Sequence, residues 1–282
     1  MIESGSRPII SLYANKNFMI MKATRFFALA ALALISVTAY SQAKVVAHRG
    51  YWRADGAAQN SIASLRKADQ IKCFGSECDV LQTKDGVLVV NHDPHVGPDK
   101  ILIEDAKYKD IKDIKLSNGE KVPTLKEYLK ALKKCQNALL VLEIKEHSTD
   151  EKMVKATRDI VAMVNQMGLA DRVYYISFMP TICDEIVKIA PKAEIAYLSN
   201  KMTPEQAKQR GYTGVDFHYS QFQKNPNWVQ ECHDLGLNVN VWTVNTEELM
   251  NQMLDLGVDF ITTDCPELLQ KVLLERQRSG IF

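Results

Sequence analysis

From residue 44 onward, short runs with strand character alternate with segments that have helical periodicity. Eight runs of this kind occur, at residues 44–48, 77–79, 138–145, 173–178, 194–198, 214–218, 238–244 and 259–263. Because strands that alternate with helices form parallel sheets, eight repeats over about 240 residues predict a (β/α)8 TIM barrel. A doubly wound open sheet is the alternative. Such a sheet usually has a glycine-rich phosphate loop after its first strand, where this sequence has only Arg49-Gly50.

Two additions to a simple barrel are expected early in the chain. Asp85-Gly86 is a strong hairpin signal, so residues 87–91 should return antiparallel to the second strand. Residues 94–123 are polar and contain turn signals, and this stretch is too short to bury a core of its own. The predicted fold is therefore a barrel with a β-hairpin after strand 2 and a short insertion before strand 3.

Capping residues mark where several helices begin. Asn60 is expected to cap the helix that follows the first strand, because asparagine is a preferred N-cap residue. Thr124 and Glu127 have the spacing of a capping box. Before the strand at 238–244, one helix is predicted over 226–235.

The first 41 residues have the pattern of a leader rather than of a barrel. Met21 is followed by a short basic region and an apolar run at 26–37, and small residues around Ser41 suit signal peptidase. The apolar run is too short to span a bilayer, and no cysteine follows it to accept a lipid. We therefore expect residues 1–41 to be an upstream segment plus a signal peptide, with the start at Met21 and cleavage near Ser41. Residues 42–282 would be a single exported, periplasmic domain without a stable membrane anchor; a buried or anchoring N-terminal helix is the alternative.

The charge balance argues against a large anionic partner. The formal net charge is +1, and residues 1–41 contain four basic side chains and one acidic side chain, so residues 42–282 carry −2. This balance provides no electrostatic surface for nucleic acid or an anionic membrane, and the substrate is expected to be a small molecule. The six cysteines show neither CxxC pairing nor zinc spacing, so most are expected to be buried as small apolar side chains.

Three acidic residues lie toward the carboxyl ends of strands, where barrel active sites form. Glu77 and Asp79 are two residues apart in an extended segment and therefore point to the same face. Glu143 lies near the end of an otherwise apolar strand, where an unpaired charge is costly to bury. Carboxylates in one space repel unless a cation or proton separates them, and an all-oxygen site suits Mg²⁺ or Ca²⁺. An ion-pair network without metal, Glu143–Lys145 or Glu77–Arg49, is the alternative.

Histidines, cations and an aromatic residue accompany the acids at strand ends. His48 and His92 follow different strands that face the same mouth, and two imidazoles can act as general base and general acid. A structural hydrogen bond is the alternative for either histidine alone. Arg49 and Lys145 supply positive charge, and the planar guanidinium suits phosphate oxygens. Trp242 is predicted to form an apolar wall for the substrate, with barrel packing as the alternative.

Several ordered motifs occur along the chain. They are His48-Arg49-Gly50, Glu77-x-Asp79-Val80-x-x-Thr83-Lys84-Asp85-Gly86, Val90-x-His92-Asp93, Pro123-Thr124-Leu125, Leu142-Glu143-Ile144-Lys145, Val241-Trp242-Thr243-Val244-Asn245 and Ile261-Thr262-Thr263-Asp264-x-Pro266. Together these motifs resemble the glycerophosphodiester phosphodiesterase family. The resemblance covers the chain from about Val45 to Leu269, and the combination of motifs is specific although each alone is weak.

The resemblance implies a TIM barrel that hydrolyses glycerophosphodiesters to glycerol 3-phosphate and an alcohol. The attacking group would be a glycerol hydroxyl, by way of a cyclic phosphate, or water. By motif position, the resemblance assigns one divalent cation to Glu77, Asp79 and Glu143, acid–base catalysis to His48 and His92, and phosphate binding to Arg49 and Lys145.

One position departs from the family pattern. Where the family usually has Pro-Glu-Asn-Thr, this chain has Ala58-Gln59-Asn60-Ser61, so a neutral Gln59 stands in place of an acid. We expect Gln59 to lie behind the metal ligands and to influence metal affinity or substrate choice. The alternative functions are a related phosphodiesterase that acts on lysophospholipid, phosphoinositide or polymeric glycerophosphate, and a non-catalytic barrel that binds phosphodiesters.

Overall fold

The computed structural model describes Met1 and residues 42–280. The described strands and helices all belong to the unit Ser41–Phe282. Apart from Met1, the expected upstream segment and signal peptide (residues 1–41) lie outside the described residues. Among the residues that are described, no helix has both the length and the apolarity needed to cross a bilayer.

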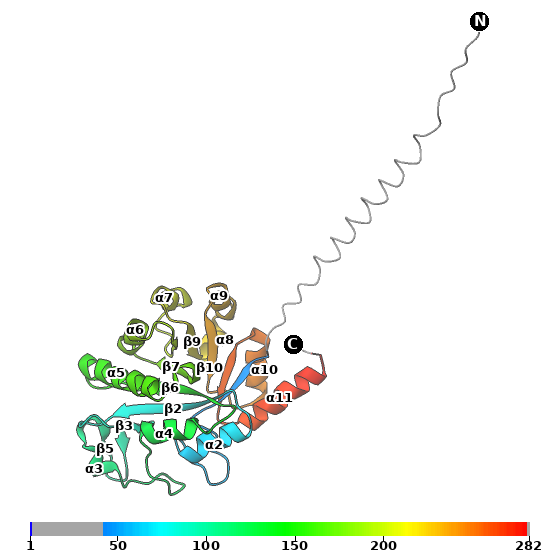
Figure 1. Ribbon diagram of the computed structural model, residues 1–282. Helices are drawn as coiled ribbons and strands as arrows, with labels where there is room; N and C mark the ends of the chain where they lie inside the picture. The colour runs from blue at the N-terminus through cyan, green and yellow to red at the C-terminus, as the bar shows by residue number, and fades with distance from the viewer. Residues whose placement is uncertain (2–41, 281–282) are drawn as a thin grey trace. The chain divides into compact units, whose positions relative to one another are not determined.

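Eight parallel strands form a closed barrel (Figure 1). They are β1 (Lys44–Ala47), β2 (Gly75–Gln82), β6 (Leu139–Ile144), β7 (Val173–Ser177), β8 (Glu194–Tyr197), β9 (Gly214–His218), β10 (Asn238–Trp242) and β11 (Phe260–Thr263). Around the barrel the order is β1, β11, β10, β9, β8, β7, β6 and β2, and the pairing of β2 with β1 completes the circle. The predicted TIM barrel is confirmed.

Helices surround the barrel (Figure 1). They are α2 (Ile62–Gln70), α4 (Leu125–Leu132), α5 (Asp150–Gln166), η2 (Ala170–Arg172), α6 (Pro180–Ile189), α7 (Pro204–Gln209), α8 (Tyr219–Lys224), α9 (Trp228–Asp234), α10 (Glu247–Leu256) and α11 (Pro266–Arg278). Val215 and Phe217 of β9 belong to the large apolar cluster beneath the helices, whereas Val46 and Val141 belong to a separate cluster within the barrel. Because side chains alternate along a strand, Glu143 faces the same way as Val141, toward the barrel interior.

The start of α2 differs from the expectation. Its N-cap is Ser61, whose hydroxyl accepts a hydrogen bond from the backbone N–H of Ser64, and not Asn60. Asn60 instead has a positive φ of 60°, and its side chain reaches the acidic residues of the barrel. The capping box of Thr124 and Glu127 at the start of α4 is confirmed.

The segment before β10 contains two helices rather than one. The predicted helix over 226–235 corresponds to α9, and α8 precedes it. The N-cap of α8 is His218, whose ring accepts a hydrogen bond from the backbone N–H of Ser220. Histidine is not among the usual capping residues, so the sequence did not reveal this helix start.

The hairpin and the insertion form one addition to the barrel. Strand β3 (Leu88–Val90) pairs antiparallel with β2, as predicted. The insertion contains β4 (His95–Val96), β5 (Ile101–Leu102), η1 (Ile103–Asp105) and α3 (Tyr108–Ile111). Its buried side chains, among them Val96 and Ile103, pack with Leu81 and Val89 of the hairpin. The insertion therefore shares its core with the hairpin, in agreement with its short length.

All six cysteines are free. Five are buried and Cys265 is partly exposed, so most of them behave as the small apolar side chains that were expected.

Candidate active site

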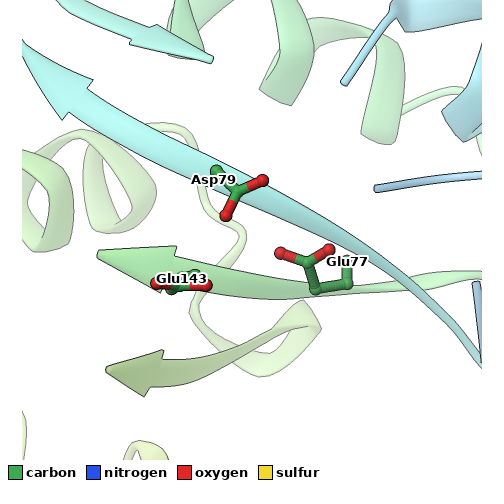
Figure 2. Close-up of side chains that lie close together, drawn as sticks. All are labelled: Glu77, Asp79 and Glu143. Carbon is green, nitrogen blue, oxygen red and sulfur yellow. The ribbon is translucent and has the colours of Figure 1, made fainter. Parts of the chain in front are cut away.

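The acidic residues of β2 and β6 meet inside the barrel. The register of the two strands places Asp79 directly beside Glu143, and Figure 2 shows both with Glu77 between the strands. One oxygen from each of the three carboxylates lies within 4.8 Å of the others. The residues are only 3% (Glu77), 1% (Asp79) and 8% (Glu143) exposed. We refer to them as the acidic triad.

Burial and mutual repulsion control the protonation of the acidic triad. Burial, followed by the neighbouring carboxylates, raises the pKa of Glu77 well above its ordinary value and raises the pKa of Glu143 to about 8. Burial disfavours the charge of Asp79 as well, but Lys145 and other neighbours outweigh it, so the pKa of Asp79 is lowered. The triad therefore contains one stable carboxylate and two whose ionisation needs further positive charge.

The donor set of the triad fits a divalent cation. In the described part of the chain, Oε1 of Glu77 is buried without a hydrogen-bond partner, which costs about 1–3 kcal/mol for a neutral acceptor and more for a charged one. Three clustered carboxylates are the oxygen ligands that Mg²⁺ and Ca²⁺ prefer. The alternative ion-pair network is only partly present. Lys145 pairs with Glu143, but Arg49 meets Glu77 through its backbone N–H (2.7 Å).

Asn60 fixes the orientation of Asp79. Its Nδ2 donates to Oδ2 of Asp79 (2.8 Å), and its Oδ1 accepts from the backbone N–H of Asp79 (3.1 Å). The positive φ of Asn60 is tolerated more readily by asparagine than by most residues. This residue therefore supports the central carboxylate from the loop after β1.

Lys145 bridges two members of the triad. Its Nζ lies 2.8 Å from Oε1 of Glu143 and 3.3 Å from Oδ1 of Asp79. Burial by itself favours the neutral amine, but the two carboxylates outweigh it and raise the pKa of Lys145. Lys145 is therefore a partly buried cation beside the triad.

Arg49 lies on the other side of Asp79. Its Nη1 donates to Oε1 of Gln59 (2.8 Å), and its Nε is 3.8 Å from Oδ2 of Asp79. Arg49 has a positive φ of 54°, and Gly50 follows with a φ of 76° at a point where a Cβ would lie 2.2 Å from Oγ of Ser64. Because Gln59 is neutral, Asp79 is the only ion-pair partner of Arg49 among the described residues, and the guanidinium can also bind an anion.

His48 is oriented by Asp264. Its Nδ1 lies 2.8 Å from Oδ1 of Asp264, which also accepts from Nε1 of Trp52 (3.0 Å), and Nδ2 of Asn245 donates to the other oxygen (2.8 Å). Although burial opposes ionisation, the hydrogen bonds from His48 and Trp52 lower the pKa of Asp264. A carboxylate only accepts hydrogen bonds, so Nδ1 of His48 carries a proton, and in the neutral imidazole the lone pair is on Nε2.

His92 follows β3 and lies near the triad. Its Nδ1 is 2.8 Å from Oδ1 of Asp93. Burial lowers the pKa of His92, and the charges of Lys145 and Arg49 add to this effect, while Asp79 opposes it. The ring is therefore neutral near pH 7 and can accept a proton.

Trp242 lies at the end of β10 in an aromatic group. Its ring meets those of Phe178 (5.6 Å between centroids) and His218 (5.2 Å), both close to perpendicular. Its Nε1 donates to the backbone oxygen of Asp216 (2.9 Å), and the side chain packs against the cluster within the barrel. The packing that was the alternative for Trp242 is therefore present on one side of its ring. Contact of the other side with substrate is a proposal.

Two supporting residues were not assigned these roles from the sequence. Asp264 was part of a motif without a function, and Asn60 was expected to cap a helix. Their partners His48 and Asp79 are 216 and 19 residues away, and such contacts leave no local pattern. The sequence placed Asp264 at the end of the last strand, where barrel active sites form, but that position alone does not give its role.

Comparison with known proteins reveals similarity over nearly the whole barrel. The model of the glycerophosphoryl diester phosphodiesterase family matches residues 48–268. A glycerophosphodiester phosphodiesterase of Caldanaerobacter subterraneus subsp. tengcongensis is 31% identical over 242 residues, which are 80% of this chain and 95% of the relative.

Solved structures are similar as well. A glycerophosphodiester phosphodiesterase from Parabacteroides distasonis is 49% identical, with a TM-score of 0.82 over 84% of this chain and 98% of that chain. A phosphodiesterase from Oleispira antarctica, solved with the product sn-glycerol-3-phosphate, has a TM-score of 0.73 over 82% of this chain and 96% of its own. At 23% identity, the second similarity supports the fold alone.

Proposed function

This chain belongs to the glycerophosphoryl diester phosphodiesterase family and is a phosphodiesterase, and we propose that it hydrolyses small glycerophosphodiesters to glycerol 3-phosphate and an alcohol in a metal-dependent reaction. The acidic triad is the observation that carries the metal dependence, because its three oxygens lie within 4.8 Å of one another and one buried oxygen of Glu77 lacks a partner among the described residues.

Glu77, Asp79 and Glu143 would hold the divalent cation, Mg²⁺ or Ca²⁺. When bound, such a cation supplies charge neutralisation and polarisation of a phosphoryl oxygen. Asn60 keeps the Asp79 carboxylate oriented through two hydrogen bonds, 2.8 and 3.1 Å long. A hydrogen bond of this kind to a metal ligand commonly raises metal affinity by roughly 10- to 100-fold.

Arg49 and Lys145 would bind the phosphate group. Both lie beside Asp79. Nε of Arg49 is 3.8 Å from Oδ2 of Asp79, and Nζ of Lys145 is 3.3 Å from Oδ1. A phosphodiester carries one negative charge, and two fixed cations stabilise the additional charge that develops on its oxygens during displacement. Trp242 would provide an apolar surface beside this group.

His48 and His92 would transfer protons in the reaction. The net reaction adds water across one P–O ester bond: the attacking oxygen loses a proton, and the leaving alcohol gains one. Asp264 holds the proton of His48 on Nδ1, which leaves Nε2 as a base, and the two histidines would serve as general base and general acid.

Release of glycerol 3-phosphate from glycerophosphocholine by residues 42–282 tests the proposal. We expect turnover by the wild-type protein and a loss of about 10²-fold or more in His48→Ala and His92→Ala, each with unchanged circular dichroism. His233→Ala is the matched control, because His233 pairs with Asp259 (3.0 Å) before β11, at the other end of the strands. No product from the wild-type protein under any divalent cation would refute the proposal.

A lysophospholipid is the second candidate substrate. Phe178, which lies against Trp242 at the carboxyl end of β7, is 39% exposed and could contact an acyl chain. One exposed ring is a small apolar surface for a lipid, so the water-soluble diester remains the primary proposal. Hydrolysis of lysophosphatidylcholine at a higher kcat/KM than glycerophosphocholine would reverse this order.

We further propose that residues 1–41 act as an upstream segment and signal peptide, so that the enzyme is exported to the periplasm. The support is the basic and apolar pattern of the sequence. The N-terminal sequence of the protein recovered from cells should begin near Gln42, and an intact Met21 in the mature protein would contradict export by cleavage.

A further inference from the structure

Two cavities adjoin the proposed phosphate site, and His92 borders both. One has a volume of about 370 Å³ and is lined by His92, Lys145 and residues of the loop after β6. We call it the β6-side cavity. The other has a volume of about 710 Å³ and is lined by His92, Arg49 and residues of the loop after β1. We call it the β1-side cavity. A phosphodiester has two ester substituents, so a phosphate bound near His92 has one cavity available for each.

The two cavities differ in chemistry. The β1-side cavity is polar. It contains the guanidinium groups of Arg49 and Arg53, the amides of Gln59 and Asn60, and the carboxylates of Asp55 and Asp93, of which Asp93 is engaged by His92. The guanidinium groups suit the phosphate of glycerol 3-phosphate, and the amides and carboxylates suit its hydroxyls. The β6-side cavity has apolar walls instead, among them Leu81 and Leu102. The alcohol that leaves the phosphate is therefore assigned to the β6-side cavity.

Two carboxylates line the β6-side cavity, and only one of them is engaged. Glu104 accepts from the backbone N–H of Ser148 (2.9 Å) and lies 3.4 Å from Nζ of Lys152. Glu146 is exposed and has no ion-pair partner within residues 42–280. The negative charge of Glu146 is thus free to act on a ligand.

The basic groups of the β6-side cavity do not neutralise Glu146. Lys145 is paired with Glu143 and Asp79. His147 lies 3.0 Å from the backbone oxygen of Lys145 through Nδ1, and its Nε2 accepts from the backbone N–H of Gln82. Both ring nitrogens of His147 are therefore occupied by the protein, and the cavity keeps an uncompensated carboxylate beside apolar walls.

We propose that the β6-side cavity binds the alcohol part of the substrate and that Glu146 selects a cationic amino alcohol, of the choline or ethanolamine class. This inference rests on the proposed glycerophosphodiesterase function. The apolar walls accommodate methyl and methylene groups, and the carboxylate attracts the ammonium. A neutral polyol such as glycerol lacks the ammonium that this carboxylate attracts.

The test compares substrates that share glycerol 3-phosphate and differ in the alcohol. The kcat/KM of glycerophosphocholine and of glycerophosphoglycerol would be measured for wild type, Glu146→Gln, Glu146→Lys and Glu151→Gln. Glu151 is the matched control because it is an exposed acid on α5 that lines a different cavity. The ratio of the two kcat/KM values cancels any change in protein folding or in the shared chemistry.

We expect the choline-to-glycerol ratio to fall about three- to tenfold in Glu146→Gln, to fall further in Glu146→Lys, and to stay at the wild-type value in Glu151→Gln. Added salt should reduce the wild-type ratio toward that of Glu146→Gln. Hydrolysis of both substrates with the same ratio in all four proteins would overturn this inference alone. Absence of glycerol 3-phosphate from both substrates would overturn the proposed function and this inference with it.

Discussion

Asp264 is the residue that gives His48 a defined tautomer. It accepts hydrogen bonds from His48, Trp52 and Asn245, which together engage both of its carboxylate oxygens. Its effect on the reaction is indirect, because it touches the imidazole rather than the substrate. Positioning of this kind is expected to alter turnover more than substrate binding.

We predict that Asp264→Asn lowers kcat by about 10- to 100-fold and changes KM by less than about threefold. The amide can present its NH₂ group to Nδ1 of His48 and so favour the opposite tautomer. Steady-state kinetics with glycerophosphocholine measures both constants. Asp259→Asn is the matched control, since Asp259 holds His233 (3.0 Å) at the amino end of β11. Equal kcat values in wild type and Asp264→Asn would remove Asp264 from the account.

A buried acid outside the acidic triad is expected to influence stability rather than catalysis. Asp216 on β9 accepts from Nδ2 of Asn240 (3.0 Å), and its other oxygen has no partner in the described residues. Burial raises the pKa of Asp216 from 3.8 to about 8. Because this pKa is higher in the folded protein than in the unfolded chain, the acid contributes stability that is fully present below pH 3.8. This contribution is lost as the pH rises to about 8.

We therefore predict that Asp216→Asn gains stability relative to wild type as the pH rises from 4 to 8, and that the difference levels off above pH 8. The amide cannot ionise, so it avoids the cost of burying a charge. Urea unfolding at a series of pH values gives the two free energies of unfolding. Parallel curves over this range would mean that Asp216 ionises normally in the folded protein.

At the scale of elements, the sequence predicted those parts that depend on local pattern. The eight strands, the hairpin at Asp85-Gly86 and the capping box at Thr124 were all found from periodicity and turn chemistry. The start of α8 was missed because its cap is His218. The pairing of Asn60 with Asp79 was missed because it joins the loop after β1 to β2. Tertiary contacts of this kind can override a capping preference, and a single sequence does not reveal them.

The insertion also supports the start of α2. Oε2 and Oε1 of Glu120 accept from the backbone N–H groups of Ile62 (3.0 Å) and Ala63 (3.2 Å) in the first turn of that helix. These N–H groups have no partner within the helix, and a negative charge near them is favourable. Glu120 therefore connects the insertion to the loop that carries Asn60.

We predict that Glu120→Ala lowers the free energy of unfolding by about 1–2 kcal/mol. Glu275→Ala on α11 should change it by less than about 0.5 kcal/mol, because its pair with Lys271 (3.7 Å) is exposed. Urea unfolding of both variants and wild type provides the comparison. Equal effects of the two substitutions would show that Glu120 makes no special contribution.

At the scale of the whole molecule, barrel closure brings distant residues together. His48, directly after the first strand, meets Asp264, directly after the last strand, because β1 pairs with β11. Glu77 meets Glu143 because β2 pairs with β6. The sequence placed all of these residues at strand ends, and the TIM-barrel prediction implied that they share one mouth. The side-chain partners and the two cavities required the three-dimensional structure, because they depend on strand register and loop conformation.

Restoration of activity by a divalent cation tests the central claim most directly, namely that the acidic triad is the metal site of the enzyme. Chelator-treated protein would be titrated with Mg²⁺ or Ca²⁺ while glycerol 3-phosphate release from glycerophosphocholine is followed. We predict saturable recovery in wild type and a midpoint at least about tenfold higher in Glu143→Gln, because one of three oxygen ligands is weakened. Full activity in the presence of excess chelator, or the same midpoint in both proteins, would contradict the account.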